Sequence, residues 1–311
     1  MIIRNNIKGR ALLCLLCLSF ILAACQSAAT DIPTTPEGTT AQDPIVVAVT
    51  DTPSPDPTST AIPVAATVNG EAIPLSYYEN EVKRYKASIA EGTEMPSDEE
   101  ISQTVMDYLV EQELLAQAAK QAGFSFSDED LEEQIANLLG QLGSGSALSN
   151  WMASNFYDDA EFRYALRLSS EAAWQRDQII ATVPDAVEQV RARQIFAQTQ
   201  AGAERALTSL ASGTSFDDLA WEFSPETGGE LGWFPRGYLL FPEIEDAAFS
   251  LPVGEYSGII QTEIGYHIIL VMEHEEAHPL TTDAKVTLQS QALSQWLENQ
   301  RTQAVIETQI P

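Results

Sequence analysis

The sequence predicts an α+β protein in which a helical region precedes a small antiparallel sheet flanked by helices. Two patterns carry this prediction. From Ser76 to Ile179, apolar residues recur at helical spacing in several separate runs. After Pro184, the alternation in Val190–Phe196 (VRARQIF) predicts a strand, and short helices and strands then follow one another up to Met272.

The composition sets the size and the charge of the molecule. With 311 residues, 44% of them hydrophobic, the chain is long enough for two domains with hydrophobic cores. Its 45 acidic and 16 basic residues give a formal net charge of -29. Such a chain is repelled by phosphate backbones, so we expect no nucleic-acid partner. The acidity either serves solubility alone or favours basic client chains, and the oligomeric state stays open.

The first 24 residues have the pattern of an export signal. Basic residues at positions 4, 8 and 10 precede an apolar run, residues 11–23, which is short for a membrane span. The run ends in Leu22-Ala23-Ala24-Cys25, which resembles the lipobox of bacterial lipoproteins. The resemblance implies that residues 1–24 are removed and that a lipidated Cys25 anchors the chain to the membrane outside the cytoplasm. The alternative is an ordinary secretory signal in which Cys25 is incidental.

Cysteine usage and the next segment follow from this signal. Cys14 and Cys17 would leave with it, so the mature chain would keep Cys25 alone, and no disulfide or cysteine metal site is expected. Residues 25–63 are rich in Thr, Pro, Ser and Ala. This composition cannot bury enough apolar surface to offset its ordering entropy, which predicts a disordered tether.

The folded part is predicted to begin near Val64. Two short apolar segments surround an Asn-Gly turn in AATVNGEAIP, and a helical run follows from Ser76 to about Ala90. Capping pairs mark the starts of later helices, namely Ser97 with Glu100, Ser127 with Asp130, and Asp158 with Glu161. The apolar stripes of these helices are most simply a shared core.

Beyond Pro184 the expected elements are short. The sequence predicts two helices, a glycine turn (SPETGGE), a strand with Leu231 and Trp233, a third helix and two closing strands. The expected ranges are Ala203–Leu210, Ser215–Phe223 and Pro242–Phe249 for the helices, and Tyr256–Thr262 and His267–Met272 for the closing strands. The two glycines permit backbone angles that other residues avoid.

Val190–Phe196 together with Gly228–Met272 (GGELGWFPRGYLLFPEIEDAAFSLPVGEYSGIIQTEIGYHIILVM) resembles the parvulin, or PpiC-type, peptidyl-prolyl isomerases. The resemblance implies an enzyme that rotates X-Pro peptide bonds and needs no nucleophile, metal or cofactor. The implied polar centre is Thr262 and His267, with Gln194 where the family usually carries a second histidine and Glu226 where relatives carry Asp or Cys. The implied apolar cup is Leu231 and Leu240, with Ile244 in place of the usual Phe.

VNGEAI and the later segment DYLVEQELLAQAAKQAG resemble the N-terminal domain of SurA- and PrsA-like foldases. That resemblance implies a helical lobe, residues 64–183, which binds unfolded, newly exported polypeptides. A final amphipathic stretch, predicted as a helix from Thr282 to about Thr308, needs a partner. In this family it packs back on the N-terminal helices. The parvulin domain, residues 184–280, would then be inserted between two segments of an all-α chaperone lobe, the second being residues 281–311.

Two alternatives remain open. The substitutions at Gln194 and Ile244 suit a non-catalytic holdase, which would use a drifted parvulin fold for client binding. His274-Glu275-Glu276-Ala277-His278 satisfies the H-E-x-x-H signature of zinc metallopeptidases, in which both histidines, here His274 and His278, lie on one face of a helix. The preceding IILVM alternates like a strand and Pro279 disfavours helix at His278, which argues against this class.

Overall fold

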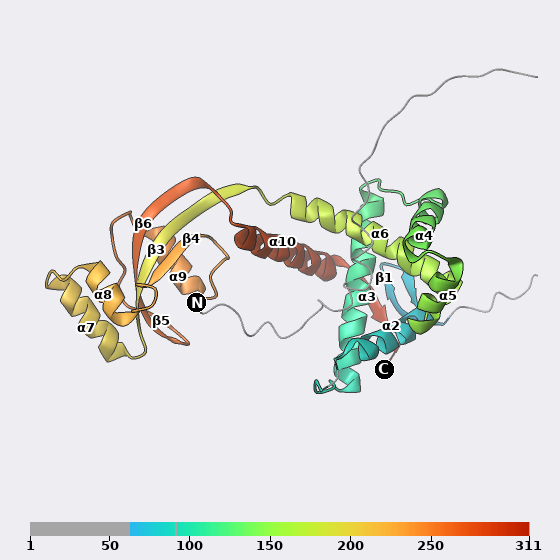
Figure 1. The fold of residues 1–311 in the computed structure, drawn as a ribbon, viewed down its shortest axis with the longest axis horizontal. Helices are drawn as coiled ribbons and strands as arrows, with labels where there is room; N and C mark the ends of the chain where they lie inside the picture. The colour runs from blue at the N-terminus through green and yellow to red at the C-terminus, as the bar shows by residue number, and fades with distance from the viewer. Residues whose placement is uncertain (1–62, 91, 311) are drawn as a thin grey trace, which may run out of the picture. The chain divides into compact units, whose positions relative to one another are not determined.

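The computed structural model describes residues 63–90 and 92–310 (Figure 1). The predicted signal peptide, the predicted lipidation site Cys25 and nearly all of the predicted tether lie outside these residues. The chain divides into two compact units, of which the first combines residues up to Glu171 with those from Ala304 onward and the second is Ala172–Gln303. The α+β class with small antiparallel sheets is confirmed, and each unit holds one such sheet.

The sheet of the first unit brings together the two ends of the described chain. β1 (Val64–Val68) and β2 (Glu71–Pro74) form a hairpin whose turn residues Asn69 and Gly70 have φ values of 52° and 88°. Asn-Gly is favoured in such a turn because both residues tolerate positive φ. β7 (Ile306–Thr308) pairs with the other side of β1, which gives the order β2-β1-β7.

The C-terminal helix is shorter than predicted and belongs to the second unit, and the first unit is not all-α as predicted because it contains the sheet β2-β1-β7. α10 (Thr282–Gln303) ends before the expected position near Thr308, and residues 306–308 form a strand instead. The register pairs Ala66 with Thr308 and Val68 with Ile306. Backbone groups at the edge of β1 need partners, and a count of helical spacing in a short terminal stretch does not detect that distant requirement.

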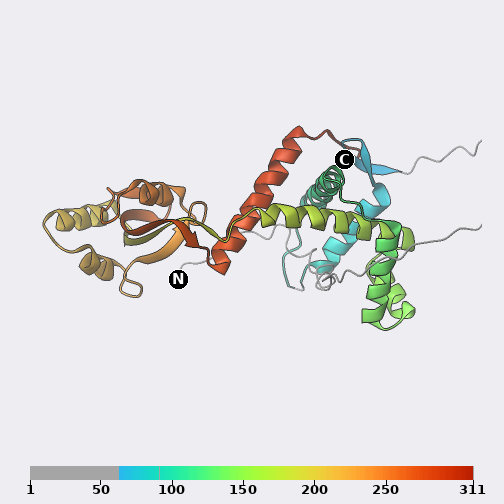
Figure 2. The ribbon, with the colours of Figure 1, turned by 90° about the horizontal axis from the view of Figure 1, so that it is seen from above.

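Among the described residues, five helices precede the sheet of the second unit. They are α2 (Leu75–Ser88), α3 (Asp98–Gln121), α4 (Asp128–Leu142), α5 (Gly145–Ser154) and α6 (Asp159–Ala181). α3, α4 and α6 begin directly after the predicted capping residues Ser97, Ser127 and Asp158. The capping boxes of Ser97 with Glu100 and Ser127 with Asp130 are both formed. α4 and α5 lie side by side in both views of the ribbon (Figures 1 and 2).

The second unit contains a four-stranded antiparallel sheet in the order β4-β3-β6-β5. Its strands are β3 (Ala186–Ala197), β4 (Glu230–Pro235), β5 (Ile260–Thr262) and β6 (Gly265–Pro279), and its flanking helices are α7 (Gln200–Ala211), α8 (Phe216–Phe223) and α9 (Pro242–Ser250). β5 is shorter than the predicted strand from Tyr256, which forms only an isolated bridge with Leu270. β6 runs past the predicted end at Met272 to Pro279.

Alternation along the two central strands assigns side chains to the faces of this sheet. On β3, Val190 packs in the core beneath α9, whereas Ile195 packs in the core with α7 and α8. On β6, Ile269 belongs to the α9 core. Side chains two residues apart share a face. Gln194 and His267 therefore both lie on the α9 face, although they are far apart in the sequence.

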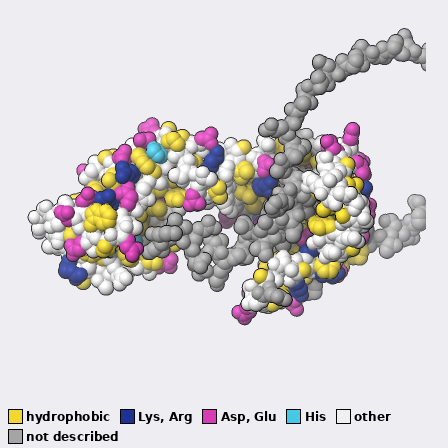
Figure 3. Space-filling view, in the orientation of Figure 1, with side chains coloured by type: hydrophobic (Ala, Val, Ile, Leu, Met, Phe, Trp, Pro, Cys, Tyr) yellow, Lys and Arg dark blue, Asp and Glu magenta, His cyan; other side chains and the backbone are white. Residues whose placement is uncertain are grey.

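The surface reflects the acidic composition. Asp and Glu side chains are spread over the visible face of the described chain, with Lys and Arg among them (Figure 3). Within residues 63–90 and 92–310, every helix falls short of the length or the hydrophobicity needed to cross a bilayer.

Candidate active site

A close backbone approach at the glycine turn positions Gln194. The N–H of Gln194 donates to the carbonyl oxygen of Gly229 at 2.8 Å. Gly229 has a φ of 71°, and a Cβ at this residue would lie 1.9 Å from the carbonyl oxygen of Gln194. Gly228 is constrained as well, since its Cβ would lie 2.7 Å from the ring of Trp221. The glycine pair is therefore required for the turn to lie against β3 at the residue that faces His267.

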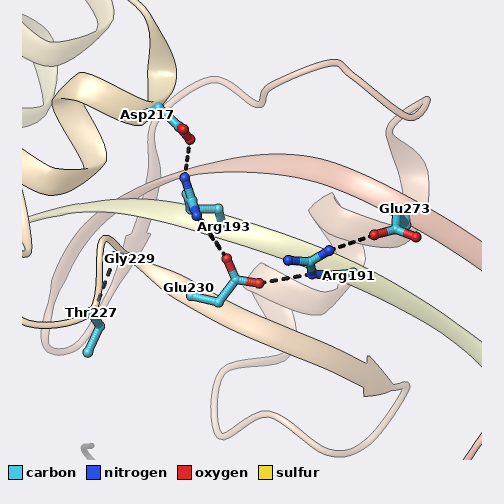
Figure 4. Close-up of polar contacts among 7 residues, drawn as sticks. All are labelled: Arg191, Arg193, Asp217, Thr227, Gly229, Glu230 and Glu273. Atoms are coloured by element: carbon cyan, nitrogen blue, oxygen red, sulfur yellow. Dashed lines mark hydrogen bonds and ion pairs between the residues drawn. The ribbon is translucent and has the colours of Figure 1, made fainter.

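Ion pairs hold the same turn from the side (Figure 4). Glu230, directly after the glycines, accepts from Arg191 Nε at 3.0 Å and from Arg193 Nη2 at 3.1 Å. Arg191 also pairs with Glu273 of β6 at 2.6 Å, and Arg193 pairs with Asp217 of α8. The partly exposed pairs of Arg191 contribute at most about 1 kcal/mol each. Arg193 is more buried, and the four pairs together join three strands and a helix. No spacing in the sequence predicts this network.

The structure brings Gln194, His267 and Thr262 into one hydrogen-bonded series. His267 Nδ1 lies 2.8 Å from Gln194 Oε1, and His267 Nε2 lies 2.9 Å from Thr262 Oγ1. His267 is 2% exposed. With the amide oxygen of Gln194 facing Nδ1, the imidazole carries its proton on Nδ1, and Nε2 accepts from the threonine hydroxyl.

Burial determines the charge of this histidine. Removal from water lowers the pKa of His267 below its ordinary value, because burial penalises the imidazolium form. Both ring nitrogens are occupied by uncharged partners, so no carboxylate offsets that penalty. The imidazole is therefore neutral at physiological pH.

Two aromatic rings lie beside the imidazole. The ring centroid of Phe196 is 5.0 Å from that of His267, and the centroid of Phe241 is 6.3 Å away. Phe196 approaches closely because Gly265 has no side chain, since a Cβ there would lie 2.7 Å from the Phe196 ring. The polar series thus adjoins an apolar wall.

The apolar residues that the resemblance implied lie in different environments. Ile244 is 4% exposed, in the core between the sheet and α9, and Leu231 is half-buried against the same core. Leu240, by contrast, is 81% exposed. Its neighbours Leu239 and Phe241 pack on the core instead. Glu226 is exposed in the turn after α8, and no described contact joins it to the polar series.

Two domain families match the chain. The PPIC-type PPIASE domain matches residues 179–273, and the SurA-like N-terminal domain matches residues 57–159. Foldase protein PrsA of Caldanaerobacter subterraneus subsp. tengcongensis is 31% identical over 225 residues, which are 66% of this chain and 72% of that relative. This chain belongs to the PrsA family of parvulin foldases. Its PpiC-type domain classes it among the peptidyl-prolyl isomerases.

Further similarities include an enzyme and a solved structure. The parvulin-like PPIase of Rickettsia typhi is 28% identical over 201 residues, 60% of this chain and 66% of that protein. The crystal structure of peptidylprolyl isomerase PrsA from Bacillus anthracis covers 64% of this chain and 96% of its own, at 21% identity and a TM-score of 0.41. The resemblance to parvulins and to SurA- and PrsA-like foldases is confirmed.

The parvulin domain of this PrsA-family chain has a further polar clamp that sequence reasoning missed. Glu245 is 6% exposed, and its carboxylate accepts the backbone N–H groups of Gly237 at 2.7 Å and Leu239 at 2.5 Å. The clamp fixes the loop that leads to Phe241. In the sequence, Glu245 is an ordinary acidic residue of the predicted helix Pro242–Phe249. No spacing between Glu245 and the loop residues Gly237 and Leu239 predicts their hydrogen bonds.

The histidines of the H-E-x-x-H pattern do not have the geometry of a zinc peptidase. The segment lies in strand β6, whereas that signature places its two histidines one turn apart on a helix. His274 Nε2 lies 2.8 Å from Glu188 Oε1, and His278 Nδ1 lies 2.9 Å from Glu275 Oε2. The ring of His278 stacks on Trp233 at 4.0 Å. In this PrsA-family domain both histidines therefore bind neighbouring side chains of the sheet.

Proposed function

We propose that this chain is an extracytoplasmic foldase, held at the membrane by a lipidated Cys25, that binds unfolded exported polypeptides and isomerises their X-Pro bonds. The observation that carries the catalytic part is the Gln194–His267–Thr262 series beside the ring of Phe241. Client binding is supported by the match of residues 57–159 to the SurA-like N-terminal domain. The anchor and the tether are supported by the sequence pattern alone.

The reaction needs an environment more than a reactive group. Rotation about an X-Pro bond crosses a barrier of roughly 20 kcal/mol and takes tens of seconds without catalysis, yet no covalent bond changes. In the twisted amide, the nitrogen lone pair no longer conjugates with the carbonyl. A poorly hydrated site disfavours the charge-separated planar amide, and hydrogen bonds that strengthen only in the twisted state lower the barrier.

The site has both a poorly hydrated apolar surface and groups that can form hydrogen bonds. In this proposal Phe241 and Leu231 receive the pyrrolidine ring, and His267 with Thr262 forms the polar floor. Ile244, 4% exposed, supports these two side chains from the core. The imidazole stays neutral because burial lowers its pKa, so it adds no charge that would favour the planar amide. Gln194 keeps the Nδ1–H of His267 oriented, as the family's second histidine would.

Leu240 and Glu226 are assigned to the rim of this site. Leu240 is 81% exposed and Glu226 is exposed, so both are open to a bound polypeptide. The domain arrangement is part of the same proposal: residues 281–311 complete the N-terminal lobe around an inserted parvulin domain. The pairing of β7 with β1 supports this for the last residues of the chain.

The catalytic proposal is tested by isomerisation of an Ala-Pro peptide, coupled to a protease that cleaves only the trans form. His267→Ala should lower kcat/KM about 100-fold, the usual loss for one preorganised polar group. His278→Ala, on the same strand but paired with Glu275, is the matched control and should retain the rate. A His267→Ala rate equal to that of the wild type would reject a catalytic role for this histidine.

A non-catalytic holdase is the second candidate function. It is favoured by Gln194, which stands where the family usually carries histidine, and by the exposure of Leu240. A holdase would suppress aggregation of an unfolded client without accelerating proline-limited refolding of a test protein. Gln194→His separates the two candidates further. An active enzyme should keep or gain rate with the restored histidine, whereas a drifted domain should stay inactive.

A further inference from the structure

The first unit contains a cavity of about 180 Å³ bordered by α2, α3, α5 and α6. Its wall includes five aromatic rings, those of Tyr77, Tyr108, Trp151, Phe156 and Tyr157. Trp151 and Tyr157 stack with their centroids 6.0 Å apart and an interplanar angle of 13°. Apolar cavities of about 150 Å³ bind benzene, so the volume suits one aromatic ring.

Arg84 at the cavity is already paired with carboxylates. The guanidinium of Arg84 lies 3.8 Å from the centroid of Tyr157, and it pairs with Glu81 at 2.9 Å and Glu161 at 3.1 Å. Burial and the nearby Glu81 raise the pKa of Tyr77, so its phenol stays neutral. Two carboxylates face one guanidinium, so this cluster has a net charge of -1 and repels an anionic ligand. The negative cluster excludes an anionic occupant, and the aromatic rings of the wall suit an uncharged aromatic one.

Two unfavourable features adjoin this cavity. Phe156 has a φ of 59°, a conformation that costs a bulky residue of order 1–3 kcal/mol. Its carbonyl oxygen, like that of Asn155, accepts from Arg84 Nη1. Arg84 Nε is buried without a hydrogen-bond acceptor among the described residues, a further cost. The ring of Phe156 is 42% exposed, so the strained turn holds an apolar ring in solvent at the cavity.

We infer that this cavity receives a single aromatic side chain of an unfolded polypeptide, which Phe156 contacts at the mouth. The inference rests on the proposed client-binding role of the lobe and specifies which client side chain it selects. An unfolded chain exposes such rings on a flexible backbone, which can enter a pocket that admits one ring at a time. Burial of one ring gives a weak, reversible contact that suits transient holding.

The test uses the full chain and two variants of α2 that add the same side chain. Ala87 is exposed and lines the cavity, so Ala87→Trp should obstruct it. Ser76→Trp adds tryptophan at an exposed position of α2 that is not part of the wall. The probes are 5-fluoroindole, observed by fluorine NMR so that added tryptophan does not interfere, and reduced, carboxymethylated α-lactalbumin as a permanently unfolded client.

Both probes should bind the wild type and Ser76→Trp alike, and Ala87→Trp should bind each about tenfold more weakly, a loss of about 1.4 kcal/mol. Isomerase activity should be unchanged in all three proteins. Equal binding of client to Ala87→Trp and wild type would overturn the inference. If Ala87→Trp loses fluoroindole binding but keeps client binding, the inference is also overturned, because the cavity would then bind free small molecules and not client side chains. A wild type that binds no unfolded client would instead refute the proposed client-binding function.

Phe156→Asn provides a second variant in case Ala87→Trp disturbs the lobe. Asparagine tolerates positive φ, so thermal stability should be retained or raised. The loss of the ring at the mouth should still weaken client binding several-fold. Unchanged client affinity in a folded Phe156→Asn protein would contradict the role of this ring.

Discussion

The glycine turn beside Gln194 allows a sharp test of how the active site is supported. Gly229→Ala would place a Cβ 1.9 Å from the Gln194 carbonyl oxygen, whereas ordinary contacts lie near 3.5 Å, so the turn must retreat by roughly 1.5 Å. The left-handed conformation costs alanine about 1–2 kcal/mol, and the lost Gln194–Gly229 hydrogen bond costs about 1 kcal/mol. We therefore expect a destabilisation of roughly 2–3 kcal/mol.

Gly232→Ala is the matched control. Gly232 also has a positive φ, 73°, but nothing lies within 4 Å of its Cβ position. Its substitution should therefore cost only the conformational term of about 1–2 kcal/mol. The difference between the two variants isolates the close approach at Gln194.

Hydrogen exchange of the β3 amides and the peptide isomerisation assay together measure these effects. A displacement of about 1 Å in a supporting group can cost a factor of about 100 in rate, so Gly229→Ala should lose most activity while Gly232→Ala retains it. Equal losses of stability and of activity in the two variants would show that the Gln194 contact does not support the site.

Two further predictions concern the lobe and the pH dependence. Asn69 Oδ1 accepts from the Val305 N–H at 2.9 Å, and Asn69 Nδ2 donates to the buried Gln117 Oε1 at 2.9 Å. Because Asn69→Gly removes both hydrogen bonds, it should lower the free energy of unfolding of the lobe by about 2–4 kcal/mol, measured by chemical denaturation. A loss of stability no larger than that caused by Gly70→Ala would contradict the stabilising role of the Asn69 side chain. Burial lowers the folded-state pKa of His267, so the unfolded chain binds more protons than the folded chain below about pH 6.5. The free energy of unfolding therefore falls as the pH decreases below this value, by at most about 1.4 kcal/mol per pH unit. The difference between wild type and His267→Gln, measured by urea denaturation at pH 7.5 and 5.5, should show this fall, and a pH-independent difference would refute it.

Local sequence signals predicted much of the fold because their causes are local. A serine followed three residues later by an acidic residue caps a helix, and both capping boxes, at Ser97 and Ser127, are formed. Asn69-Gly70 makes the hairpin turn because these residues tolerate positive φ. The alternation in Val190–Phe196 specified strand β3 and, with it, the face on which Gln194 lies.

Tertiary structure alone decided the features that depend on distant partners. The last residues form β7 because β1 presents an unpaired edge, which outweighs any helical spacing in so short a stretch. Phe241, and not Leu240, packs beside His267. Glu245 binds the backbone N–H groups of Gly237 and Leu239 and so sets the path of the loop that leads to Phe241. The amino-acid sequence by itself therefore determined the family, the starts of the helices with a capping pair, and the polar series of Gln194, His267 and Thr262, whereas Glu226 lies apart from that series. The long-range hydrogen bonds determined which apolar side chain completes the site.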